Sequence, residues 1–227
     1  MQHIAIVRAG GLAFITGALA FVGVFSYLAA NFNYPDVLEG AAADVLPALR
    51  DGGDTMRAVW ALYAMLPLLL IPGAVGAWAA APASRHRMTL ALVLAAIASL
   101  SMCLGLMRWP SVHWALAGAY AQAQPAVQAS LNVIFDGLNL YLGNYIGEFL
   151  GETLLAGFFL LTAVSMRAEP RYPAWLFYGG GAFALLFFIG AFRNVTGSVQ
   201  AVADLNNILL PVWMIALGVG MIRHARK

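Results

Sequence analysis

Residues 88–107 read MTLALVLAAIASLSMCLGLM, an uncharged stretch that lies between Arg87 and Arg108. A helix needs about 20 mostly apolar residues to cross the roughly 30 Å hydrocarbon layer of a bilayer. This stretch has that length and that composition. It therefore predicts a membrane-spanning helix, and the same test can be applied to every long interval between charged residues.

Five other intervals pass the test. Four are uncharged and lie between Arg8 and Asp36, Arg57 and Arg85, Arg171 and Arg193, and Asp204 and Arg223. The fifth, Leu142 to Met166, is long and apolar enough to span but contains Glu148 and Glu152. The first interval exceeds the 7–15 apolar residues typical of a signal peptide, so we interpret it as a retained helix. The sequence thus predicts an all-α, polytopic transmembrane bundle in one domain, 1–227, with spans near 5–30, 58–81, 88–108, 142–166, 174–192 and 205–223.

The composition excludes several protein classes. The chain of 227 residues is 62% hydrophobic and 10% charged, with a mean hydropathy of +0.81. Soluble proteins carry about 25% charged residues, so a soluble enzyme and a disordered chain are excluded. The net charge of +2 provides no basic excess for binding nucleic acid. The single cysteine, Cys103, excludes an internal disulfide and a cysteine-based metal site.

The distribution of basic residues predicts the orientation. With the N-terminus in the cytoplasm, eight Lys and Arg residues lie on the inner side and four on the outer side. The inner residues are Arg8, Arg85, Arg87, Arg167, Arg171, Arg223, Arg226 and Lys227, and the outer ones are Arg50, Arg57, Arg108 and Arg193. Because loops rich in Lys and Arg stay in the cytoplasm, we predict that both termini are cytoplasmic.

Two segments before the fourth span do not fit a simple bundle. The stretch 109–124 is uncharged and rich in Trp, Tyr and Gln, so we expect an amphipathic piece at the outer membrane interface. An unbroken helix from Ala126 to Met166 would be about 60 Å long, more than a bilayer needs. We therefore expect this helix either to project outside or to bend near Gly143 and Asn144.

A polar stripe marks the fourth span. Asn132, Asp136, Asn144, Glu148 and Glu152 are spaced by multiples of four residues, so they share one slowly turning helix face. Charge inside a membrane is costly and needs a partner. The helical rise from the inner end of this span places both glutamates in the outer half of the bilayer.

Two arginines at the outer ends of neighbouring spans offer the opposite charge at this depth. We infer an outward-facing polar cavity that binds a small polar or amphiphilic ligand. The candidate ligand-binding residues are Glu148, Glu152, Asn144, Asp136, Arg108 and Arg193.

Other interpretations of the same residues stay open. The charges can simply neutralise each other and fix helix packing, or the acid pair can serve a membrane enzyme. Gly143, Gly147 and Gly151 form a small-residue ridge, so the chain can also be an assembly subunit that packs on a second copy or on another membrane protein. No histidine is in register with the acid pair to complete a metal site, and no motif identifies a cofactor. Apart from the lipid bilayer, no partner is specified.

Several short motifs resemble a known family. They are Arg8 followed by Gly10 and Gly11, an outer Tyr34-Pro35-Asp36 turn, a fourth span rich in Gly and Glu, and the run 171–175, RYPAW, before a glycine-rich fifth span. Together they resemble a bacterial family of six-helix integral membrane proteins of unknown function. The resemblance covers nearly the whole chain and implies a single-domain protein of the bacterial inner (plasma) membrane. It implies no activity, cofactor or site residue.

Overall fold

The structure, a computed structural model, describes residues 2–225, and all regular structure in this range is helical. Six helical stretches are long and apolar enough to cross a membrane: Gln2–Phe32, Gly53–Ala80, Pro82–Tyr120, Pro125–Arg167, Ala174–Asn194 and Gly197–His224. The prediction of an all-α chain with six such helices is confirmed. Their length and composition indicate a multi-pass membrane protein.

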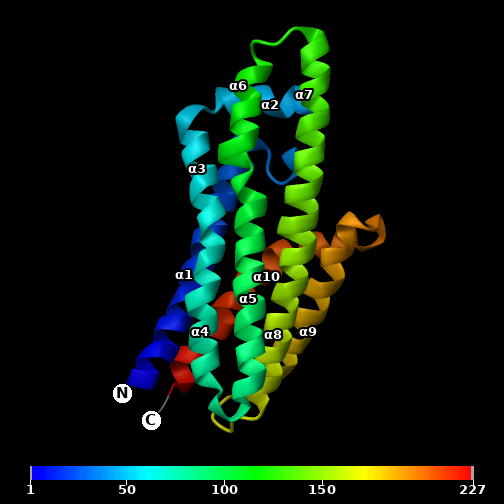
Figure 1. Cartoon of the computed structure of the whole chain (residues 1–227). Helices are drawn as coiled ribbons and strands as arrows, with labels where there is room; N and C mark the ends of the chain where they lie inside the picture. The colour runs from blue at the N-terminus through cyan, green and yellow to red at the C-terminus, as the bar shows by residue number, and fades with distance from the viewer. Residues whose placement is uncertain (1, 226–227) are drawn as a thin grey trace.

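Six helices stand side by side in a closed ring (Figure 1). In order around the ring they are α1 (Gln2–Phe32), α4 (Leu70–Ala80), α5 (Arg85–Met107), α8 (Gly151–Arg167), α9 (Ala174–Gly190) and α10 (Gln200–His224), and α10 packs back on α1. Both ends of the described chain lie at the same end of this ring, which we call the termini end. The helix α3 (Gly53–Met65) continues into α4 through a 3-10 turn, η2 (Leu66–Leu69).

Adjacent glycines let the first helix approach both of its neighbours. A Cβ on Gly10 would overlap the backbone of Gly76 in α4, and a Cβ on Gly11 would overlap the carbonyl group of Gly218 in α10. Small residues at such crossings allow backbones to pack closely in membrane bundles. The Gly-Gly pair after Arg8 therefore closes the ring on both sides of α1.

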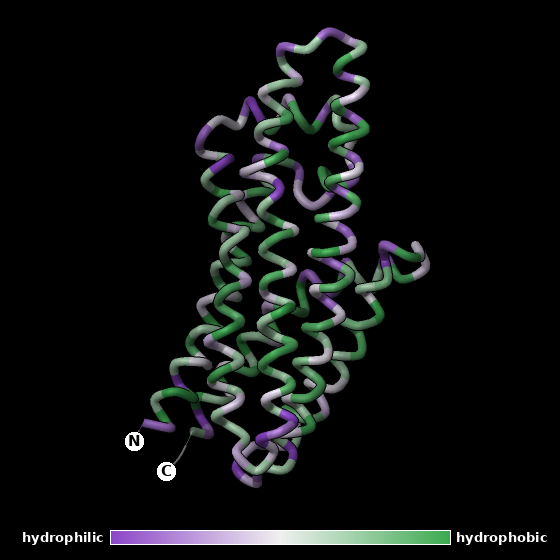
Figure 2. Tube along the Cα trace, viewed as in Figure 1, coloured by the Kyte–Doolittle hydropathy of each residue, from purple (hydrophilic) through white to green (hydrophobic). Residues whose placement is uncertain are grey.

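Apolar side chains fill the ring toward the termini end and also cover its outside. The inner core includes the fully buried Phe14, Phe158 and Leu217. On the outside, Leu19 and Leu185 are about 60% exposed (60% and 59%). Figure 2 shows hydrophobic residues along the length of the bundle and hydrophilic ones gathered at its ends. Such an apolar exterior fits contact with lipid.

Opposite the termini end, three short helices form a cap: α2 (Ala42–Asp51), α6 (Trp114–Tyr120) and α7 (Pro125–Leu138) (Figure 1). The cap has its own apolar core, separate from that of the ring. At its centre the indole rings of Trp60 and Trp109 stack with centroids 4.6 Å apart and planes 14° from parallel. Aromatic pairs of this kind add to the stability that comes from their buried area.

The stretch 109–120 continues the third long helix, and the position of 109–124 at a membrane interface stays a prediction. A short π-helix, η4 (Trp109–His113), and α6 continue from α5, so the stretch Pro82–Tyr120 is one helix of 39 residues. Trp109 is fully buried in the apolar core of the cap. Aromatic residues such as those in 109–124 are typical of a membrane interface, but the same residue types also pack the core of the cap.

The fourth long helix projects outside the ring. Pro125–Arg167 is a continuous helix of 43 residues, about 65 Å at the usual helical rise. Figure 1 shows α7 rising well beyond the orange loop between α9 and α10. Where a bend was considered, around Gly143, the chain forms a π-helix, η5 (Asn139–Leu150). Segments of π-helix are rare and frequently mark functional sites.

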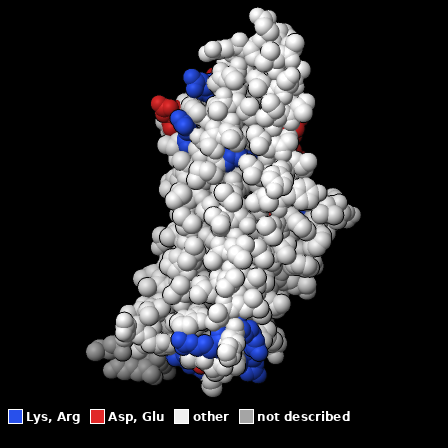
Figure 3. Space-filling view, viewed as in Figure 1, with Lys and Arg blue, Asp and Glu red and all other residues white. Residues whose placement is uncertain are grey.

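Basic residues gather at the termini end (Figure 3). Four of the arginines predicted on the inner side lie here, at the start of α5, at the end of α8 and in the loop that follows α8: Arg85, Arg87, Arg167 and Arg171. Arg226 and Lys227, also assigned to that side, lie outside the described residues.

Candidate ligand-binding site

Two carboxylates share one arginine where the ring meets the cap. The Nη1 and Nη2 atoms of Arg193, in η6 (Ala191–Asn194), donate to the two carboxylate oxygens of Glu152 at 2.7 and 2.8 Å. Nη2 also lies 3.0 Å from Oε2 of Glu148. We call these three residues the ion cluster. Their side chains are only 14–23% exposed, so the charges are largely removed from water.

Amide groups complete the polar contacts of the ion cluster. Nδ2 of Asn194 donates to Oε2 of Glu148 at 2.8 Å and to the carbonyl oxygen of Asn144 at 2.9 Å. These bonds fix η6 against η5. With both carboxylates ionised, the ion cluster carries two negative charges and one positive charge. The surplus charge is negative.

A second arginine, Arg108, follows α5 and is only 4% exposed. Its Nε donates to Oδ1 of Asn139 at 3.0 Å, and its Nη1 donates to the carbonyl oxygen of Gly105. Asn139 in turn donates to the carbonyl oxygen of Leu38 at 2.8 Å. A Cβ on Gly143 would overlap the guanidinium group, so this glycine provides the space for it.

Arg108 has hydrogen bonds but no acidic partner. Within residues 2–225, no carboxylate oxygen lies within 4.0 Å of its guanidinium nitrogens. A buried charge without a counter-ion is unfavourable by several kcal/mol, even when neutral groups donate to or accept from it. Arg108 and the ion cluster together carry no net charge, but within residues 2–225 Arg108 has no direct contact with an acidic side chain.

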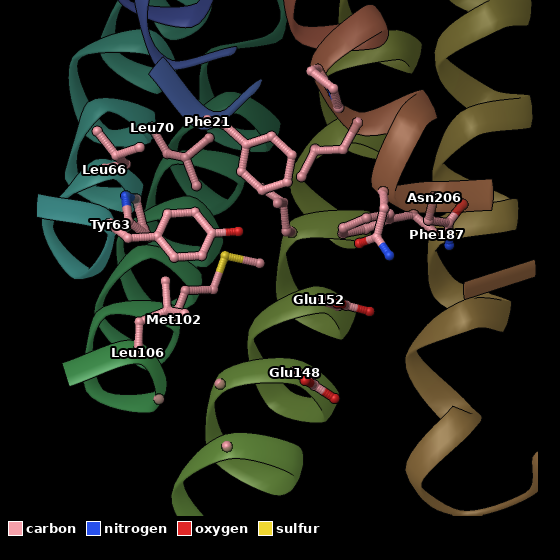
Figure 4. Close-up of a pocket in the computed structure, with 18 of the residues that line it drawn as sticks. Phe21, Tyr63, Leu66, Leu70, Met102, Leu106, Glu148, Glu152, Phe187 and Asn206 are labelled. Atoms are coloured by element: carbon pink, nitrogen blue, oxygen red, sulfur yellow. The ribbon is translucent and has the colours of Figure 1, made fainter. Parts of the chain in front are cut away.

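Both sets of charges line a cavity of about 150 Å³ inside the ring, which we call the chamber. Most of its wall is apolar, and all six long helical stretches contribute to it, as with Phe21, Leu66, Met102, Leu155, Phe187 and Leu210. Figure 4 shows Glu148 and Glu152 extending from successive turns toward the side where Phe187 and Asn206 lie. The hydroxyl group of Tyr63 points into the space between the two sides.

A second cavity of about 370 Å³, which we call the vestibule, adjoins the chamber. It lies between the segment after α1, the start of α10, the π-helix η5 and the 3-10 turn η6. Its polar lining includes Asp36, Glu39, Asn144, Asn194, Gln200 and Asp204. The two cavities share Tyr34, Leu38, Glu148, Arg193 and Asn207, so Glu148 and Arg193 of the ion cluster lie at their junction, and Glu152 lines the chamber alone.

A tyrosine from the loop after α1 forms part of this junction. The hydroxyl oxygens of Tyr34 and Tyr63 are 3.4 Å apart. Burial raises the pKa of Tyr34 above its ordinary value, although the hydrogen bond with Tyr63 acts in the opposite direction. Tyr34 is therefore a neutral hydroxyl group at physiological pH. It offers a hydrogen bond between the chamber and the vestibule.

The structure brings together five of the six candidate residues. Glu148, Glu152, Arg108 and Arg193 line the chamber, and Asn144 lines the vestibule together with two members of the ion cluster. Asp136 lies exposed on α7, in the projecting part of the helix, and lines neither cavity. Asp136 is therefore not part of the proposed site.

Some residues of the site carry no signal in the sequence. Tyr34 was noted only as part of a turn, and Tyr63 lies in an uninterrupted apolar span. Asn139 stands beside the polar stripe but five residues before Asn144, a spacing that fits the wider π-helical turn and not an α-helix. A search for i, i+5 pairs in this stretch would have connected Asn139 to the site.

The glycine ridge is occupied by the chain itself. A Cβ on Gly147 would meet the backbone of Gly105 in α5, and a Cβ on Gly151 would meet the side chain of Met102. Gly143 faces Arg108, as described above. The ridge therefore gives no support to an assembly subunit that binds another protein through these glycines.

The described part of the chain, residues 2–225, holds no group of three or more His, Cys, Asp or Glu residues able to bind a metal ion. No protein-family model, curated protein or solved structure matches the chain. The resemblance to a six-helix family stays a prediction. The function must accordingly be argued from the chemistry of the chamber, the ion cluster and the vestibule.

Proposed function

We propose that the protein is a multi-pass protein of the bacterial inner membrane that binds a small amphiphilic ligand, in order to sense or transport it. One observation carries this proposal: an apolar chamber adjoins a polar vestibule, with the ion cluster at their junction. Ligand sites are typically concave and mostly apolar, with a few polar groups that fix orientation. An amphiphile matches both parts of this cavity.

The apolar wall provides affinity and the charges provide orientation. Each methylene group that a ligand buries in the chamber contributes about 0.8 kcal/mol. The polar head then stays at the junction, where Tyr34, Asn194 and the ion cluster offer donors and acceptors. A head of the wrong polarity would leave buried charges without partners, and this is how such a site discriminates among ligands.

The proposed orientation places the termini end in the cytoplasm. It is supported by the arginines that gather at that end. In this orientation the vestibule faces the outer side. The ligand then reaches the chamber from the periplasm or from the outer leaflet.

The test compares two tryptophan variants in the same helical stretch. Leu66 lines the chamber, whereas Leu62, one turn earlier, is 55% exposed on the outside of the bundle. Leu66→Trp fills the chamber, and Leu62→Trp is the matched control. Native mass spectrometry of protein extracted in a mild detergent measures any small molecule that remains bound.

We expect a bound amphiphile on the wild-type protein and on Leu62→Trp, and its loss from Leu66→Trp. Thermal unfolding of all three proteins checks that both variants fold. An amphiphile retained equally by folded Leu66→Trp would show that the chamber is not the binding site. Absence of any bound or added amphiphile on the wild-type protein would overturn the proposed function.

A further inference from the structure

Charged residues are distributed unequally between the two cavities: two arginines and two glutamates line the chamber, whereas acidic residues predominate in the vestibule. Arg108 lines the chamber but not the vestibule. The vestibule is lined by four acidic residues and by a single basic one, Arg193: the acids are Asp36, Glu39, Glu148 and Asp204. A ligand that complements both parts needs a negative group in the chamber and a positive group outside it.

The chamber contains a buried guanidinium group that can bind an anion. Arg108 is almost fully buried and has no carboxylate within 4.0 Å in the described part of the chain. Its Nε and Nη1 atoms are engaged, and its Nη2 atom donates to no described residue. A guanidinium group presents donors that match a carboxylate or a phosphate. A bound anionic group would supply the direct ionic contact that Arg108 lacks among the described residues.

The vestibule is lined mainly by carboxylates and can bind a cation. Glu148 and Glu152 share Arg193, so one negative charge is left over at the junction. The three further carboxylates of the vestibule have no Lys or Arg within salt-bridge distance among residues 2–225. A cleft lined mainly by one sign of charge attracts the opposite sign and repels its own. A ligand carrying only negative charge would be repelled on its way to Arg108.

We propose that the ligand is a single-chain amphiphile with a zwitterionic head, in which the anionic group lies next to the chain and the cationic group lies at the far end. The chain occupies the chamber, the anion pairs with Arg108, and the cation faces Glu148 and the vestibule. This inference rests on the proposed function and names the ligand class for the same site. A phosphate with a terminal ammonium group and a carboxylate with a terminal ammonium group both have this chemistry.

Probes with one chain and different heads test the order of charges. Dodecylphosphocholine has the anion next to the chain, whereas N-dodecyl-N,N-dimethylglycine carries the same two charges in the reverse order. Dodecyl phosphate carries only negative charge, and dodecyltrimethylammonium carries only positive charge. Binding of each probe to the wild-type protein in dodecyl maltoside micelles is measured by native mass spectrometry at equal concentration.

We expect dodecylphosphocholine to bind at least tenfold more tightly than the reversed zwitterion and than either probe that carries charge of one sign. N-dodecanoyl-lysine, in which a carboxylate lies next to the chain, separates the two chemical sources. Tighter binding of the phosphate probe assigns a phospholipid-like ligand, and tighter binding of the lysine probe assigns an acyl amino acid.

Variants at the two charges assign each half of the head. Arg108→Gln should abolish the preference for an anion next to the chain, and Arg50→Gln, an exposed cap residue that lines neither cavity, should leave it unchanged. Glu148→Gln keeps the bond between Glu152 and Arg193, and should shift the preference from the zwitterion toward dodecyl phosphate. The Glu148→Gln variant keeps the proposal testable if the Arg108→Gln variant does not fold.

The possible failures are distinguishable. Equal binding of all four matched probes would overturn the zwitterion and leave the chamber as an amphiphile site. Tighter binding of the reversed zwitterion would overturn the proposed order of charges. No binding of any probe would overturn both this inference and the proposed function.

Discussion

Arg193 and Glu152 lie 41 positions apart in the sequence and are joined by two parallel hydrogen bonds of 2.7 and 2.8 Å. This bidentate contact connects η6, at the end of α9, to the start of α8. Because Glu148 also reaches Arg193, the guanidinium group is the shared centre of the ion cluster. Removal of Arg193 therefore leaves two carboxylates without their shared cation, whereas removal of one acid leaves the arginine paired with the other acid.

Arg193→Gln should destabilise the protein far more than Glu152→Gln. Loss of the arginine leaves two largely buried carboxylates without a cation, which lowers the free energy of unfolding by about 3 kcal/mol. Loss of the Glu152 charge leaves Arg193 paired with Glu148 and costs about 1 kcal/mol. Thermal unfolding in detergent measures the order, with Arg167→Gln, an exposed residue at the other end of α8, as control. Equal losses for both variants would contradict a shared arginine.

Gly147→Leu should separate α5 from η5 and destabilise the isolated chain. The new side chain would overlap the backbone of Gly105, and overpacking of this kind costs about 1–3 kcal/mol or more. Gly137→Leu, on α7, is the matched control because a Cβ there meets open space. The measurement is thermal unfolding of the purified protein. An unchanged monomer that loses a copurifying partner would instead favour the assembly interpretation.

Single cysteines should report opposite sides of the membrane for the two ends of the molecule. In a Cys103→Ala background, Gln122→Cys lies exposed in the turn between α6 and α7, and Ala83→Cys lies exposed in η3 (Pro82–Ser84). A membrane-impermeant maleimide applied to spheroplasts should label position 122 at once and position 83 only after lysis. The reverse pattern would contradict cytoplasmic termini, and labelling of both in intact cells would contradict a spanning bundle.

Trp109→Ala should loosen the cap more than the ring. The substitution removes the partner of Trp60 in the cap core, and large-to-small changes of this type cost about 3–5 kcal/mol. Hydrogen exchange should therefore rise in α2, α6 and α7 and stay slow in α8. Trp175→Ala, at a side chain that is 47% exposed, should change little. Uniform exchange across cap and ring would show that the two cores unfold as one.

The ring could be predicted from the sequence because long uncharged intervals have one common structural meaning. The cap could not, since Trp109 and its neighbours have the same composition whether they contact headgroups or one another. The ion cluster could be anticipated for a similar physical reason: buried carboxylates at helical spacing need a cation at the same depth, and Arg193 ends the next span.

The remainder of the site depends on tertiary contacts. The bond between Arg108 and Asn139 joins residues 31 positions apart, and it forms where the helix widens into a π-helix. Asp136 shares the fourfold spacing of the stripe yet lies in the cap, because spacing gives the face of a helix and not how far that helix projects. Tyr34 reaches the junction through a loop whose path no periodicity predicts.

An experimental density map of the protein in lipid nanodiscs tests the site most directly. We predict elongated density in the chamber along Phe21 and Leu210, with its head between Arg108 and Glu148. A chamber collapsed by its own side chains, or Glu148 and Glu152 bathed in bulk water, would contradict the account.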